Sequence, residues 1–196
     1  MLKIGITGGI GSGKTTVCKV FETLGIPVFY ADTVAKQLMV TDPLLIADVK
    51  LAFGNESYFD DGSLNNKHIA AIVFDNTDRL AKLNSLVHPA VFRAFDAWKN
   101  QTSSAVPYVL KEAALLFESG SYQMNDINIL VTAPLQTKLN RVMQRDGISE
   151  LQVKARMDKQ FTDEQKVKMA DYFIDNTENS SVILQVLNLH QQFLNR

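Results

Sequence analysis

The amino-acid sequence predicts an α/β fold in which helices cover a parallel sheet of five strands. Five short apolar runs alternate with helical patterns, and this alternation is typical of parallel βαβ units. A glycine-rich loop separates the first run from the first helical pattern. The length of 196 residues fits one domain that carries insertions.

The expected strands are short. They are residues 2–7, 28–32, 108–112, 127–132 and 172–175. A helical pattern over 17–24 follows the first strand, and Gly25 with Pro27 ends it before the second.

Two mainly helical stretches interrupt the alternation, at residues 34–104 and 137–166. In the first stretch, Pro43 follows the capping residue Asp42, and an amphipathic run extends from residue 78 towards residue 100. In the second stretch, capping-box patterns mark two helix starts: Ser149 with Gln152, and Thr162 with Gln165. We therefore expect two helical insertions in one core.

Composition excludes several classes of protein. With 46% hydrophobic and 21% charged residues and a net charge of −1, the chain has neither the composition of a disordered protein nor a global basic field for nucleic acid. The longest apolar run, 69–74, is far shorter than the ~20 residues that span a bilayer. The N-terminus lacks the features of a signal peptide, and the single cysteine, Cys18, excludes a scaffold held by internal disulfides. We expect a cytoplasmic protein with neither nucleic acid nor membrane as a partner.

Residues 8–15 read GGIGSGKT and match the phosphate-binding pattern GxxxxGK[ST] in full. Glycine lets backbone N–H groups point at anionic oxygens, and the start of the following helix adds its positive dipole end. Lys14 is placed to reach the β- and γ-phosphates, and the Thr15 hydroxyl to bind Mg²⁺. The alternative is a merely flexible turn, against which the strand, the spacing, the Lys and the Thr all argue. The nucleotide-binding residues expected here are Gly8, Gly9, Gly11, Ser12, Gly13, Lys14, Thr15 and Thr16.

This loop is shared by GTPases, ATPases and small-molecule kinases. The sequence has no Asn-Lys-x-Asp segment for guanine, and Glu112 ends the third strand in an imperfect version of the acidic ATPase pattern. A kinase needs an acceptor site and a lid that keeps water from the γ-phosphate. The two helical insertions would supply both.

Asp32 lies at the expected carboxyl end of the second strand, where an open α/β sheet forms its ligand crevice. A carboxylate there can accept the proton of an attacking hydroxyl. The alternative is that Asp32 caps the following helix, and the two interpretations are compatible.

Charge within the chain is uneven. Residues 137–166 hold seven Lys or Arg and five Asp or Glu, including three of the six arginines. Arg141 and Arg145 share one helix face and suit phosphate oxygens, although a solvated basic face is the alternative. His88, in the apolar segment 86–91, is a candidate for the substrate pocket, and the alternative there is a structural histidine.

Together these motifs resemble the dephospho-coenzyme A kinase family. The matching segments are 4–15, Ala31-Asp32, Leu86-Val87-His88-Pro89, Leu115-Leu116-Phe117-Glu118, Arg141 with Arg145, Arg156 with Gln160, Ala170-Asp171 and Asp175-Asn176. They occur in the family's order over nearly the whole chain. The departures are Ala114 where proline is usual, Lys67 near a position that is often arginine, and Glu112 where aspartate is common. Lysine keeps the charge of arginine but not its bidentate geometry.

The resemblance implies that ATP phosphorylates the 3′-hydroxyl of the ribose of dephospho-coenzyme A. Asp32, Lys14 and Arg141 would be catalytic, and Arg145 and Asn176 would join the loop in binding ATP. Asp32, Lys67, His88 and Glu112 would bind the acceptor, and Thr15 would bind Mg²⁺. The alternatives are a kinase for another nucleotide or small metabolite and a non-catalytic nucleotide-binding regulator.

The resemblance also implies a P-loop NTPase three-layer fold, as a monomer or small homo-oligomer. The expected single domain, 1–196, comprises a core at 1–33, 105–136 and 167–196, a helical substrate-binding insertion at 34–104 and a helical lid at 137–166.

Overall fold

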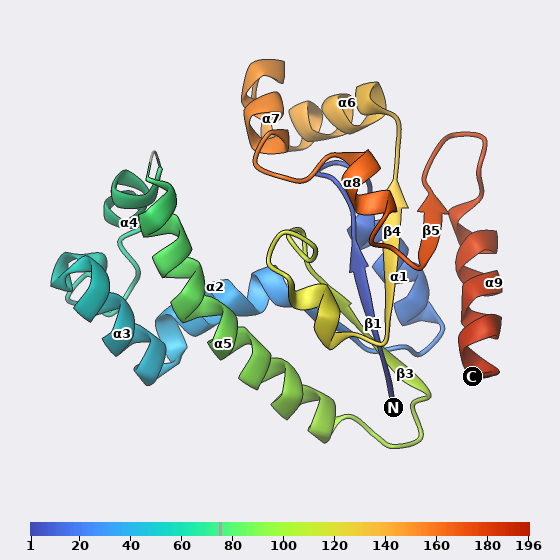
Figure 1. The fold of residues 1–196 in the computed structure, drawn as a ribbon, viewed down its shortest axis with the longest axis horizontal. Helices are drawn as coiled ribbons and strands as arrows, with labels where there is room; N and C mark the ends of the chain where they lie inside the picture. Colours follow the sequence, from blue (N-terminus) through green and yellow to red (C-terminus); the bar gives the residue numbers. More distant parts are fainter. Residues whose placement is uncertain (75) are drawn as a thin grey trace. The chain divides into compact units, whose positions relative to one another are not determined.

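The computed structural model describes residues 1–74 and 76–196, which form two compact units. The sheet unit consists of Met1–Tyr30 and Thr102–Arg196, and the helical unit consists of Ala31–Gln101. Figure 1 labels the elements of both units along the chain.

The sheet has five parallel strands, as the sequence predicted, and their order is β2-β3-β1-β4-β5. The strands are β1 (Leu2–Thr7), β2 (Val28–Tyr30), β3 (Tyr108–Glu112), β4 (Ile127–Thr132) and β5 (Tyr172–Asp175). Because β1 is central, the loop that follows it leaves the middle of the sheet.

The prediction for the second strand was wrong at its end. The strand stops at Tyr30, and α2 (Ala31–Thr41) begins at the next residue. Asp32 therefore lies in the first turn of α2, neither closing a strand nor occupying the N-cap. A carboxylate is stabilised there by the positive end of the helix dipole, which favours an early helix start.

Two helices of the sheet unit, α1 (Lys14–Thr23) and α9 (Val182–Leu194), pack side by side on one face of the sheet (Figure 1). Phe21 of α1 and Phe193 of α9 are buried with Ile4 and Ile6 of β1. Burial of such side chains is the main favourable contribution to folding, about 1.5–3 kcal/mol for each large apolar residue. This packing fixes α1, and with it the loop that begins the helix.

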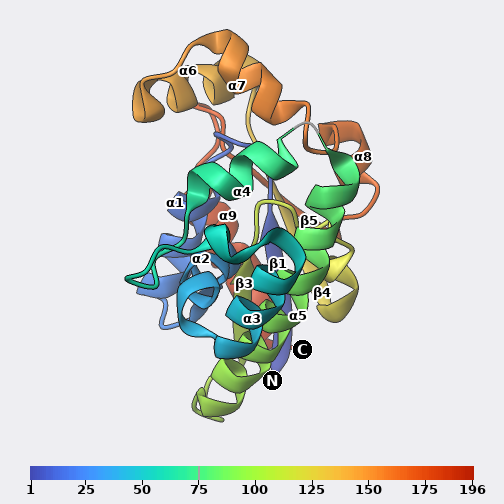
Figure 2. The ribbon, with the colours of Figure 1, turned by 90° about the vertical axis from the view of Figure 1, so that its left-hand side faces the viewer.

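The remaining helices of the sheet unit lie between β4 and β5 in sequence. They are α6 (Leu135–Asp146), α7 (Glu150–Met157) and α8 (Asp163–Val167), and a short 3-10 turn, η2 (Ser121–Met124), precedes β4. Figure 2 shows α6 and α7 next to each other at one end of this unit. Both predicted capping boxes are present, at the starts of α7 and α8.

The helical unit comprises α2, α3 (Pro43–Phe53), η1 (Asn55–Ser57), α4 (Asn66–Val73) and α5 (Thr77–Gln101). Asp42 caps α3 by accepting hydrogen bonds from the N–H groups of Leu44 and Leu45, as the Asp-Pro pattern predicted. Met39, Phe53 and neighbouring apolar residues form a core of its own. Within the two stretches that the structure describes, no helix is long and apolar enough to cross a membrane.

Candidate active site

The phosphate-binding pattern forms the loop between β1 and α1, and its backbone needs glycine. Gly13 has φ 93°, and a Cβ there would collide with the side-chain amide of Asn176. Gly11 has φ 80°, and a Cβ there would lie 2.5 Å from the Lys138 carbonyl oxygen. A side chain at either position would therefore be strained and would also push neighbouring atoms away.

A cavity of about 330 Å³ opens where this loop and the first turn of α1 meet α6. Its lining residues are Gly11, Gly13, Lys14, Thr15, Thr16, Arg141, Val142 and Arg145. All of these except Val142 are residues that the sequence singled out, Arg141 as a catalytic residue and the others for ATP binding. Backbone amides, one ammonium, two guanidinium groups and two hydroxyls thus surround one space, which suits a polyphosphate.

Arg141 and Asn176 hold the outer backbone of the loop. Asn176, which directly follows β5, donates from Nδ2 to the Ser12 carbonyl oxygen at 2.8 Å. Arg141 donates from Nη1 to the carbonyl oxygens of Gly11 and Ser12, at 3.4 and 3.5 Å. Its Nη2 donates to the Asn176 carbonyl oxygen at 3.4 Å. Because the two polar groups of a peptide unit point in opposite directions, holding the Ser12 carbonyl turns the Gly13 N–H the other way.

Two polar side chains lie within the curve of the loop. Lys14 donates from Nζ to the Gly8 carbonyl oxygen at 3.0 Å, so its side chain connects the end of the loop to its beginning. The Ser12 side chain is buried, and its hydroxyl has no hydrogen-bond partner among the atoms of the described residues. An unsatisfied buried hydroxyl costs roughly 1–3 kcal/mol, which a polar ligand atom would relieve.

Arg145 and Arg156 meet at one carboxylate. Asp146 accepts from Arg145 Nε at 2.7 Å and from Nη2 at 3.1 Å. Its other contact is from Arg156 Nη1 at 2.8 Å. The hydrogen bond from Arg145 lowers the pKa of the Asp146 carboxyl, and the same bond raises the pKa of Arg145. Arg145, which lines the cavity, thus directs its guanidinium towards Asp146 in this structure.

Glu112 ends β3, opposite Ile6 of β1 in the sheet register. The Glu112 side chain is buried. The pKa of the Cys18 thiol is raised mainly by the burial of Cys18, and the negative charge of Glu112 raises it further. Cys18 is fully buried in α1 and contributes to packing.

The helical unit contains the other predicted residues. Asp32 is exposed in the first turn of α2, and Lys67 is exposed on α4. His88 is half-buried on α5, with its ring centroid 6.2 Å from that of Phe92.

The helical unit has a cavity of its own, of about 470 Å³. We call it the helical-unit cavity; its lining residues are Ala35, Lys36, Met39, Val40, Ser63, Leu64, Asn66, Leu83, Asn84 and Val87. Most of these side chains are apolar, and two are amides. Val87 lies in the segment Leu86-Val87-His88-Pro89 that carries the resemblance, but the sequence assigned a site role to none of these ten residues.

The sequence also missed an ion pair beside the loop. Lys138 of α6 and Asp163 of α8 are joined at 2.6 Å between Nζ and Oδ2. A Cβ placed on Gly9 would lie 3.5 Å from the Lys138 nitrogen and 3.6 Å from Asp163 Oδ1. In the sequence, Lys138 is one of the seven basic residues of 137–166 and nothing sets it apart. Its burial, which marks it as part of the site, is seen only in the structure.

Protein carboxylates do not by themselves form a metal centre in the parts of the chain that the structure describes. There, no group of three or more His, Cys, Asp or Glu side chains is arranged to hold a metal ion. Thr15, at the cavity wall, offers a hydroxyl oxygen. This fits Mg²⁺, which takes oxygen ligands and usually keeps several waters together with substrate phosphates.

Comparison with known proteins agrees with this geometry. A family model described as dephospho-CoA kinase matches residues 2–181. A dephospho-CoA kinase of Salinibacter ruber is 43% identical over 177 residues, which cover 90% of this chain and 89% of the relative. A crystal structure of TT1252 from Thermus thermophilus has a TM-score of 0.87 at 33% identity, covering 98% of this chain and 97% of that one. A dephospho-CoA kinase from Campylobacter jejuni has a TM-score of 0.68 at 25% identity, with the same coverage. The chain belongs to the dephospho-CoA kinase family.

Proposed function

We propose that this kinase transfers the γ-phosphoryl group of ATP to the 3′-hydroxyl of the ribose of dephospho-coenzyme A. The products are coenzyme A and ADP, and the reaction is the last step of coenzyme A biosynthesis. The observation that carries the proposal is the cavity in which the phosphate loop, Lys14 and two arginines of α6 come together, in a chain of this family.

The residues of this cavity would bind the phosphates of ATP. The Gly13 N–H and the start of α1 present partial positive charge, and Lys14 carries a full charge that would reach the β- and γ-phosphates. Arg141 would neutralise charge on the transferring group, and Arg145 would add a second guanidinium. Phosphoryl transfer depends mainly on such positioning and charge stabilisation.

Mg²⁺ fits the hydroxyl of Thr15 at the start of α1. When it is bound together with ATP, Mg²⁺ supplies positive charge to the β- and γ-phosphates. The metal is part of the proposal, and Thr15 is the residue that we assign to it.

The helical unit would bind the acceptor. Asp32, exposed in the first turn of α2, would accept the proton of the attacking hydroxyl or orient it. Lys67 and His88, with Glu112 of the sheet unit, are the further residues that we assign to the acceptor. The helical-unit cavity suits the pantetheine arm, because apolar walls with a few amides match a chain of methylene, dimethyl and amide groups.

The test is an acceptor assay. The purified protein is incubated with ATP, Mg²⁺ and dephospho-coenzyme A, and coenzyme A is detected by mass. Formation of ADP at the same slow rate with and without this acceptor would contradict the proposal. A parallel panel of nucleoside monophosphates separates it from a kinase for another nucleotide. ATP binding without turnover on any acceptor would favour a non-catalytic regulator.

A further inference from the structure

Ile10 begins the outer arc of the phosphate loop, residues 10–13, and is held through both its side chain and its backbone. The Ile10 side chain packs against the buried cluster of Leu139, Val142 and Val153, which belongs to α6 and α7. The Ile10 N–H donates to Oε1 of Gln160 at 2.9 Å. Ile10 is not among the lining residues of the cavity, whereas Gly11, Gly13 and Lys14 of the loop are. Ile10 is therefore anchored by its side chain to α6 and α7 and by its backbone to Gln160.

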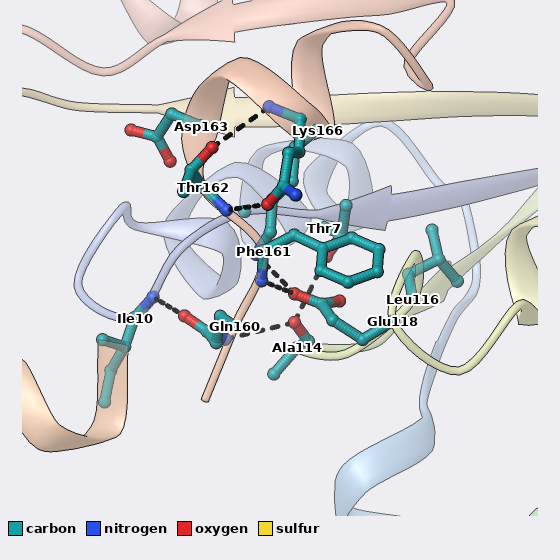
Figure 3. A network of polar contacts seen from close by, with 12 residues as sticks. Thr7, Ile10, Ala114, Leu116, Glu118, Gln160, Phe161, Thr162, Asp163 and Lys166 are labelled. Carbon is teal, nitrogen blue, oxygen red and sulfur yellow. Dashed lines mark hydrogen bonds and ion pairs between the residues drawn. The ribbon is translucent and has the colours of Figure 1, made fainter. Parts of the chain in front are cut away.

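Gln160 uses its other side-chain atom on a second element. Its Nε2 donates to the Ala114 carbonyl oxygen at 3.3 Å, and this oxygen also accepts from Thr7 Oγ1 at 3.5 Å (Figure 3). Thr7 is the last residue of β1, and Ala114 lies just after β3. One primary amide thus accepts from the loop and donates to the segment beyond β3, which sets its orientation because only Oε1 can accept and only Nε2 can donate.

The segment that carries Gln160 is itself anchored. The next residue, Phe161, donates its N–H to Glu118 Oε1 at 2.8 Å (Figure 3). The same oxygen lies 3.0 Å from Nζ of Lys166, whose side chain is fully buried. These contacts hold residues 160–166 against residues 114–118, so Gln160 is presented to the loop from a fixed support.

We propose that Gln160 is a positioning residue for ATP binding. By holding the Ile10 N–H, it fixes the backbone just before Gly11 and Gly13, which line the cavity. Loss of the bridge frees the arc, so that ATP binding must then order it at the expense of affinity. This inference rests on the proposed binding of ATP by the loop, but it requires nothing about the acceptor.

The test compares two glutamine variants in the full chain. Gln160→Met keeps the length of the side chain and removes both hydrogen bonds of the bridge. Gln165→Met is the matched control, because Gln165 Oε1 also accepts a backbone N–H at 2.9 Å, that of Thr162 at the start of α8. The dissociation constant for ATP with Mg²⁺ is measured by calorimetry, and folding is checked by circular dichroism.

We expect Gln160→Met to weaken ATP binding about tenfold, which corresponds to about 1.4 kcal/mol, and Gln165→Met to change it less than about twofold. Equal weakening in the two variants, or unchanged binding in Gln160→Met, would overturn the inference. If Gln160→Met does not fold, Gln160→Ala is used, which likewise removes both the acceptor for the Ile10 N–H and the donor to the Ala114 carbonyl oxygen. A loss of at least about threefold then supports the bridge, and wild-type affinity contradicts it. Failure of the wild-type protein to bind ATP would instead contradict the proposed function.

Discussion

Asn176 and Ser12 are 164 residues apart in sequence, and the Asn176 side chain donates to the Ser12 carbonyl oxygen at 2.8 Å. The Asn176 carbonyl oxygen in turn accepts from Arg141. The phosphate loop, α6 and the residue after β5 are therefore joined by hydrogen bonds around one cavity. This arrangement makes the position of the loop depend on groups that do not belong to its motif.

Asn176→Ala removes the shortest of these contacts. We expect ATP to bind about five- to tenfold more weakly, because the Ser12 carbonyl keeps only the longer contact from Arg141 and then fixes the direction of the Gly13 N–H less well. Calorimetric titration with ATP and Mg²⁺ measures the effect. Asn188→Ala, on the exposed side of α9, is the control and should bind as the wild type does. An unchanged dissociation constant in Asn176→Ala would show that this contact does not position the loop.

Gly13→Ala tests the backbone of the loop itself. Alanine disfavours φ 93°, and its Cβ would displace the Asn176 amide. We expect ATP binding to weaken by more than about tenfold, because both the strain and the displacement alter the N–H groups at the start of α1. Gly120→Ala is the control, since Gly120 also has a positive φ, 72°, but a Cβ there would meet open space. Equal ATP affinity in the two variants would contradict the expectation.

The elements of the fold could be predicted because each depends on neighbours in sequence. The five strands read as short apolar runs, and the starts of α3, α7 and α8 carry side chains that satisfy their own first N–H groups. The end of the second strand was predicted too late, since apolar residues at 28–31 suit a strand as well as the first residue of a helix. Boundaries of this kind are decided by packing and not by local pattern.

In the candidate site too, features that depend on nearby residues could be predicted, and contacts between distant segments could not. The loop and the two arginines of α6 could be read from spacing, because a motif and a four-residue step on one helix are local features. The bridge from Ile10 to Gln160 spans 150 residues, and the pair of Glu118 with Lys166 joins two segments that no periodicity relates. Contacts of this kind arise only when the sheet brings β1, β3 and α8 together.

Asp32→Asn tests the proposed acceptor chemistry. The amide cannot take a proton from the attacking hydroxyl, and we expect kcat to fall by about 10²-fold or more while ATP affinity stays near that of the wild type. Steady-state assays with dephospho-coenzyme A give kcat, and calorimetry gives the affinity. Asp48→Asn, on α3, is a control for loss of one carboxylate from the same unit. Unchanged turnover in Asp32→Asn would remove this residue from its proposed role.

Asp146→Asn is expected to change stability only over part of the pH range. Hydrogen bonds and charge from Arg145 and Arg156 lower the pKa of Asp146 in the folded state. A lowered pKa contributes stability above the ordinary carboxyl pKa, and that stability is lost as the pH falls through the lowered value. Thermal unfolding should therefore give a lower Tm for Asp146→Asn than for the wild type at pH 7, and the two should converge at acid pH. A constant difference across the range would contradict the ionic origin of this contact.

Glu118→Gln tests the buried support of Gln160. Lys166 is fully buried, and Glu118 Oε1 lies 3.0 Å from its Nζ, so the substitution leaves a buried ammonium without its counter-charge. We expect a loss of about 3 kcal/mol in the free energy of unfolding, measured with urea. The double variant Glu118→Gln with Lys166→Met should recover most of this loss, because it removes the unpaired charge as well. Glu150→Gln is the control: its partner Lys154 is 51% exposed, and that pair should contribute less than about 0.5 kcal/mol. Equal losses in Glu118→Gln and Glu150→Gln would mean that burial does not set the strength of the Glu118–Lys166 pair.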